Sequence, residues 1–104
     1  MSQFWELVEG IMAQENSSIT DKHIVREGNK AHIWFPEVFR AVKDETRGKF
    51  AFSKNAVLSA IREEPYYVSN DKKISVGLDG VRRLVMTLDL EKAPDSIRNI
   101  ALAN

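Results

Sequence analysis

Two segments carry most of the fold information in this chain: "FSKNAVLSAIREEPYYV" over residues 52–68 and "KKISVGLDGVRRLVMTLDL" over residues 72–90. Ser53 is a favoured N-cap residue, and apolar side chains follow it at helical spacing. A proline ends this pattern, so the run predicts a helix from Ser53 to about Glu64. Beyond a polar break at Ser69 to Asp71, alternating residues around Asp79-Gly80 predict a β hairpin.

Two registers of this hairpin fit the turn residues. A two-residue turn at Asp79-Gly80 leaves Leu84 and Met86 on the face opposite Ile74. A three-residue loop, Leu78 to Gly80 with Gly80 left-handed, pairs Ile74 with Leu84 and puts Met86 on the same face. We prefer the three-residue loop because it makes one apolar face. The opposite, wetter face then collects Lys73, Ser75, Arg83, Val85 and Thr87.

The rest of the chain adds three helices and a second hairpin. Apolar spacing and end signals predict helices from Ser2, as N-cap, to about Gln14, from Pro36 to about Thr46, and from about Asp95. "HIV" and "AHIWF" around Gly28-Asn29 predict a hairpin that pairs Ile24 with Ile33. Its other face carries His23, Val25, His32 and Trp34. The aromatic core is expected to contain Phe4, Trp5, Phe35, Phe39, Phe50 and Phe52.

This order, with a short connection between the second and third helices and a hairpin after them, is close to that of a winged helix. Residues 52–90 resemble the winged-helix modules of primase-helicase and related replication proteins of phages, plasmids and other mobile elements; the resemblance covers roughly residues 30–100. It implies DNA binding or docking within a replication complex. We therefore expect an α+β winged helix-turn-helix with about three main helices, a β-hairpin wing and a short C-terminal helix. Without an attached ATPase or polymerase portion, the chain is expected to be an excised domain or an accessory subunit.

Composition narrows the class of protein. A length of 104 residues with 43% hydrophobic side chains predicts one domain over residues 1–104. The chain has 29% charged residues and no long apolar run, so we expect a cytoplasmic protein without a membrane partner. The absence of cysteine excludes disulfides, thiolate nucleophiles and cysteine-ligated zinc.

The net charge of zero hides an uneven distribution. Residues 1–46 carry five basic and eight acidic side chains, whereas residues 47–83 carry eight basic and four acidic ones. A basic segment around a third helix and a wing attracts phosphates. The candidate nucleic-acid-binding residues are Lys49, Lys54, Asn55, Ser59, Arg62, Lys72, Lys73, Arg82 and Arg83.

Two features of this set leave the mode of DNA binding open. Asn55, Ser59 and Arg62 form the polar face of the third helix and could read base edges of a duplex. Glu63 and Glu64 would repel phosphate, so the N-terminal end of this helix is the more credible end to insert. Aromatic rings of Trp34 and of the tyrosines at 66 and 67 could instead stack unpaired bases, which keeps single-stranded DNA as a competitor.

Catalysis and metal binding are not expected. His23 and His32 lack a third ligand of suitable spacing, and the chain has no HExxH, CxxC or phosphate-binding loop. No cofactor is therefore predicted. The competing hypothesis is a winged-helix protein adaptor, whose apolar face or acidic N-terminal third docks a replication or transcription partner such as a helicase, primase or polymerase.

Overall fold

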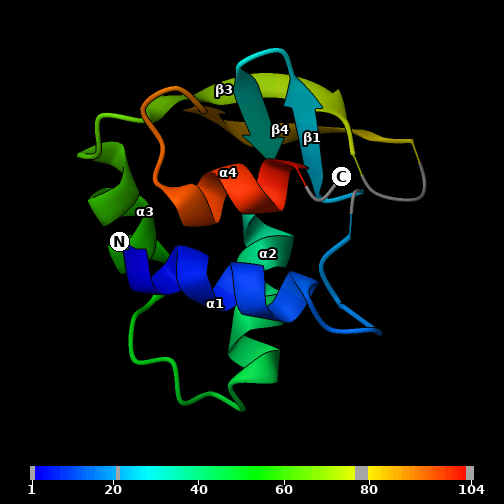
Figure 1. The fold of residues 1–104 in the computed structure, drawn as a ribbon, viewed down its shortest axis with the longest axis vertical. Coiled ribbons are helices and arrows are strands. Elements are labelled where there is room, and N and C mark those ends of the chain that lie inside the picture. The colour runs from blue at the N-terminus through cyan, green and yellow to red at the C-terminus, as the bar shows by residue number, and fades with distance from the viewer. Residues whose placement is uncertain (1, 21, 77–79, 103–104) are drawn as a thin grey trace.

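Helices and a sheet form separate layers in the computed structural model, which describes residues 2–20, 22–76 and 80–102. Figure 1 shows the helices gathered on one side of the sheet, so the chain has an α+β fold. The sheet is antiparallel, with strand order β1-β2-β4-β3. The described elements are α1 (Ser2–Met12), β1 (Ile24–Glu27), β2 (Lys30–Ile33), α2 (Phe35–Glu45), α3 (Lys54–Arg62), β3 (Tyr67–Ser75), β4 (Arg82–Asp89) and α4 (Asp95–Leu102).

The helices lie where the apolar spacing predicted them, within two residues at the ends that were assigned. Ser53 caps α3 as expected, because its hydroxyl accepts a hydrogen bond from the backbone N–H of Ala56 at 3.1 Å. The prediction that Ser2 caps α1 is wrong, since the helix already includes Ser2. Helix α2 begins one residue before Pro36, which is compatible with proline in a first helical turn.

An aromatic cluster forms the centre of the core between α1 and α2. The ring of Phe4 lies with its centroid 5.1 Å from that of Trp5, 5.6 Å from that of Phe35 and 5.9 Å from that of Phe50. Trp5 is fully buried, and its indole N–H donates to the hydroxyl of Tyr66 at 3.0 Å. This hydrogen bond satisfies a buried donor and ties α1 to the segment before β3.

The core assignment of Phe52 is wrong. Its side chain is 42% exposed, and its ring forms a T-shaped contact with that of Phe50, at 5.6 Å between centroids. The residue lies one position before the cap of α3, outside the helix, so the periodicity of α3 does not turn it toward the core. The other five aromatic residues assigned to the core are buried as predicted.

The first hairpin has the predicted register. Ile24 pairs with Ile33 and Glu27 with Lys30, which leaves Gly28 and Asn29 as the turn. Gly28 has a positive φ of 59°, a conformation that glycine adopts without strain. Strand β2 also pairs with β4 through Ile33 and Met86, so apolar residues of three strands face the helices.

The second hairpin contradicts the preferred register. Ile74 pairs with Arg83 rather than with Leu84, and Lys73 pairs with Leu84. Strand β3 also continues through the predicted polar break at Ser69 to Asp71, where two register shifts accommodate the extra residues. Of the predicted loop Leu78 to Gly80, residues 78 and 79 lie outside the described residues. Gly80 has the predicted left-handed backbone, with a φ of 71°.

The register prediction assumed that only one face of the hairpin is buried, but both faces of the sheet carry buried side chains. On the face away from the helices, Val85 is 1% exposed and Thr87 is 4% exposed, so this is not the wetter face that the sequence predicted. Long side chains from the neighbouring strands and from the hairpin end cover it, as the contacts of Lys72 and Arg83 described below show. Lys73 faces the opposite way from Arg83, because adjacent strand positions alternate.

Candidate nucleic-acid interface

Helix α3 presents the polar side chains that were predicted to face a ligand. Asn55, Ser59 and Arg62 are exposed, whereas Val57 and Ile61 on the opposite side of the helix are buried. Lys54 is also exposed at the first turn of α3. The helix therefore has a solvent-exposed polar face, with the positive charges of Lys54 and Arg62 at its two ends.

The four hairpin cations divide between the two faces of the sheet. Lys73 is opposite Leu84, and Arg82 is opposite Ser75, so both cations lie on the face that carries the helices. Lys72 and Arg83 are opposite Val85 and Ile74, on the other face. One flat ligand cannot contact all four side chains, and only Lys73 and Arg82 share a face with α3.

A shallow groove of about 150 Å³ connects α3 with the helix-facing side of the hairpin. Its apolar lining includes Leu58 of α3 and Leu84 of β4, and Leu84 is 47% exposed. Lys54 lies at the groove from α3, and Asn70 lies at it from β3. Because residues of α3, β3 and β4 line it together, a ligand in the groove would contact both the helix and the hairpin.

The side chain of Arg83 makes contacts within the fold. Its guanidinium carbon lies 4.4 Å from the centroid of the Trp34 ring, and its Nη1 donates to the carbonyl oxygen of Val76 at 2.6 Å. The imidazole of His23 stacks on Trp34 with 5.7 Å between ring centroids. Arg83 and Trp34, which the sequence offered as nucleic-acid contacts, therefore contact each other in the structure through a cation–π interaction.

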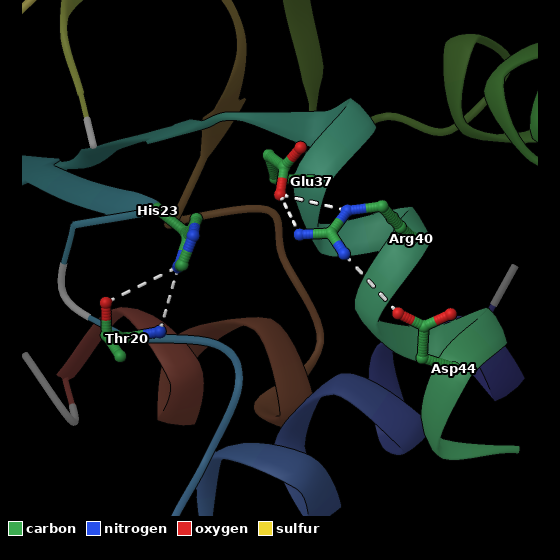
Figure 2. Close-up of polar contacts among 5 residues, drawn as sticks. All are labelled: Thr20, His23, Glu37, Arg40 and Asp44. Atoms are coloured by element: carbon green, nitrogen blue, oxygen red, sulfur yellow. Dashed lines mark hydrogen bonds and ion pairs between the residues drawn. The ribbon is translucent and has the colours of Figure 1, made fainter. Parts of the chain in front are cut away.

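Figure 2 shows the polar contacts around His23 and along α2. The backbone N–H of Thr20 donates to Nδ1 of His23 at 3.0 Å, which assigns the acceptor role to that nitrogen. On α2, Arg40 forms ion pairs with Glu37 and, at 3.4 Å, with Asp44. These side chains are satisfied by their own neighbours, and none of them faces the groove's lining.

Lys72 spans the outer face of the sheet. Its Nζ lies 3.2 Å from Oε1 of Glu27 on β1, although β1 and β3 are the two edges of the sheet. Oε1 of Glu27 is also 3.5 Å from Nε2 of His32, which is 2% exposed and shares a 2.9 Å hydrogen bond with Thr87 through Nδ1. Lys72 therefore forms an ion pair across the outer face of the sheet. Contact between Lys72 and a DNA phosphate would have to compete with this ion pair.

The Glu27–Lys72 ion pair on the sheet and the Glu37–Arg40 ion pair on α2 each lower the pKa of the carboxyl group that they contain. Lys72, followed by His32, lowers the pKa of Glu27 below 4.5, and Arg40 lowers the pKa of Glu37 in the same way. A lowered folded-state pKa contributes stability above the unfolded pKa, and this stability is lost as the pH falls.

We expect the free energy of unfolding to decrease below about pH 4.5 and the variant Glu27→Gln plus Glu37→Gln to show a shallower decrease. Urea unfolding at a series of pH values measures both; equal slopes would contradict the assignment.

The remaining predicted site residue, Lys49, lies in the segment between α2 and α3 and is exposed. Asn70 and Leu84 line the groove and were not predicted as site residues from the sequence. Leu84 was assigned to an apolar face with Ile74, and Asn70 to a break between strands. For the exposed Phe52, the sequence did carry a signal, because this residue immediately precedes the helix cap Ser53 and so lies outside the helical periodicity.

Among residues 2–20, 22–76 and 80–102, no group of three or more His, Cys, Asp or Glu side chains could hold a metal ion. Within the same residues, no helix has both the length and the apolar character needed to cross a membrane. Protein-family models, curated proteins and solved structures were compared with the chain, and none of them matches it.

Proposed function

We propose that this chain is a non-catalytic winged-helix module that binds DNA in the replication of a phage or another mobile element. The strand order β2-β4-β3, with α2 and α3 preceding the β3–β4 hairpin, supports the winged-helix assignment. Helix α3 would act as the recognition helix and the hairpin as the wing. The role in replication comes from the resemblance of residues 52–90 described above.

The observation that carries the DNA-binding proposal is the shared face of Lys54, Lys73 and Arg82. Lys73 and Arg82 lie on the helix-facing side of the hairpin, and Lys54 lies at the groove that joins this side to α3. Of the described residues, none forms an ion pair with Lys54 or Lys73. Positive side chains without internal partners remain available to neutralise phosphates and to release counterions.

Wild-type protein is expected to bind fluorescein-labelled DNA with an affinity that falls steeply with salt. Fluorescence anisotropy with duplex and single-stranded oligonucleotides measures this at about 50 mM and about 200 mM salt. Three phosphate contacts predict a slope of roughly −2 to −3 in a plot of log affinity against log salt concentration. Absence of binding to both DNA forms at the lower salt concentration would contradict the proposal.

A protein adaptor is the second candidate function, and the exposed apolar side chains favour it. Leu84 at the groove and Phe52, one position before the cap of α3, are both more than one third exposed. An apolar patch with a basic rim suits an acidic partner segment of a helicase, primase or polymerase. In that case the protein would bind its partner in a pull-down and would not bind either form of DNA.

A further inference from the structure

The groove between α3 and the hairpin has a size that limits its occupant. Its volume of about 150 Å³ is below the roughly 300–1,000 Å³ of a site that encloses a drug-sized ligand. The apolar lining comes from the start of α2 through Phe35, from Leu58 on α3 and from Leu84 and Met86 on β4. The groove therefore accepts one flat apolar group rather than the extended face of a helix, which requires several anchor residues in a row.

The charges around the groove select an anionic ligand. Lys54 lines the groove, and Lys73 is the direct cross-strand neighbour of Leu84. Arg82 lies two residues before Leu84, on the same face of β4. No carboxylate is among the described residues that line the groove. A ligand with a flat apolar part and negative charges on both sides matches this arrangement.

The polar lining of the groove adds a hydrogen-bonding group. Asn70 lines the groove from β3 and lies between the two residues where the strand changes register, Ser69 and Lys72. An asparagine amide offers both a donor and an acceptor, and this combination pairs with the edge of a base. A nucleobase between two backbone phosphates has the flat ring, the polar edge and the flanking charges that the groove requires.

We propose that this groove holds one unpaired base of single-stranded DNA, with the neighbouring phosphates on Lys54, Lys73 and Arg82. The inference rests on the proposed DNA-binding function and specifies its substrate. The base packs against Leu58 and Leu84, and Asn70 contacts its edge. A base within a duplex is stacked and cannot enter, so the module prefers single-stranded DNA over a duplex of the same length.

The test compares probes that differ only in their bases. Fluorescence anisotropy is measured with an oligothymidine, with an abasic strand of equal length, with a duplex, and with a peptide of alternating glutamate and leucine. Wild-type protein is expected to bind oligothymidine about tenfold more tightly than the abasic strand, because the abasic strand lacks the ring that packs against Leu58 and Leu84. Leu84→Ala should remove this difference and leave the affinity for the abasic strand unchanged.

Val68→Ala is the matched control for the Leu84 variant. Val68 is 45% exposed on the same hairpin and does not line the groove, so this variant should retain the preference for oligothymidine. Equal binding of oligothymidine and the abasic strand by wild-type protein overturns the inference and leaves the proposed function intact. Leu84-dependent binding of the peptide alone overturns both in favour of a protein partner, and no binding to any DNA overturns the proposed function itself.

Discussion

Reversal of the two cations on the helix-facing side of the hairpin, Lys73→Glu plus Arg82→Glu, is expected to lower the affinity for DNA at least tenfold at about 0.1 M salt. Both side chains lie on the face shared with α3, and each reversal replaces a phosphate contact with a repulsion. The salt slope should also become shallower by about two, because about two fewer counterions are released. Fluorescence anisotropy over a series of salt concentrations measures both quantities.

The matched control for this variant is Lys22→Glu plus Arg26→Glu. These two exposed cations lie just before and on β1, at the opposite edge of the sheet from β3, and the charge change is the same. If the control lowers the affinity as much as the Lys73 and Arg82 variant, the binding surface is not centred on α3 and the β3–β4 hairpin. Far-ultraviolet circular dichroism establishes that both variants retain the fold.

Charge reversal of the neighbouring pair Arg82 and Arg83 would not separate DNA binding from stability. Arg83 packs on Trp34 and donates to the carbonyl oxygen of Val76, so Arg83→Glu breaks contacts within the fold as well as removing a charge. Loss of binding in that variant would combine two causes. The choice of Lys73 in place of Arg83 depends on the observed register of β3 and β4.

Phe4→Ala is expected to lower the free energy of unfolding by about 3–5 kcal/mol. The ring is completely buried, and it contacts Trp5, Phe35, Phe39 and Phe50, so truncation leaves a cavity at the centre of the core. Small domains have a total stability of about 5–15 kcal/mol, so this loss is a large fraction of it. Urea unfolding followed by tryptophan fluorescence measures the difference.

Phe52→Ala provides the comparison, because the same chemical change is made at an exposed position. Phe52 is 42% exposed and forms a T-shaped contact with Phe50, and we expect a loss below about 1.5 kcal/mol. Equal losses for Phe4→Ala and Phe52→Ala would contradict the burial of one ring and the exposure of the other.

The local elements could be predicted because their signals are local. Ser53 offers a hydroxyl to the first turn of α3, and Pro36 has a backbone angle that suits a first helical turn. Gly28 and Asn29 specify a two-residue turn, and that turn sets the register of Ile24 against Ile33. In each case the residues that set the conformation lie within a few positions of one another, so the order of helices and hairpins follows from the chain itself.

The candidate site could be predicted only in part. The sequence located the positive charge on α3 and on the hairpin, but it grouped Lys73 with Arg83 and placed Phe52 in the core. The side of the sheet that each hairpin cation faces depends on what covers the outer face. That cover includes Glu27, which lies 45 positions from Lys72 in the chain.

The chain's own pattern was therefore sufficient for the identity and order of the elements, for the α+β class and for the segment that carries the positive charge. Tertiary packing decided the rest. On the outer face, Val85 and Thr87 are buried beside Lys72, which pairs with Glu27, and beside His32. Both faces of the sheet therefore carry buried side chains, and alternation of apolar residues no longer specifies the register. The register in turn put Lys73 and Arg82 beside α3 and Leu84 into the groove, because cross-strand neighbours are set by pairing between distant segments rather than by local sequence.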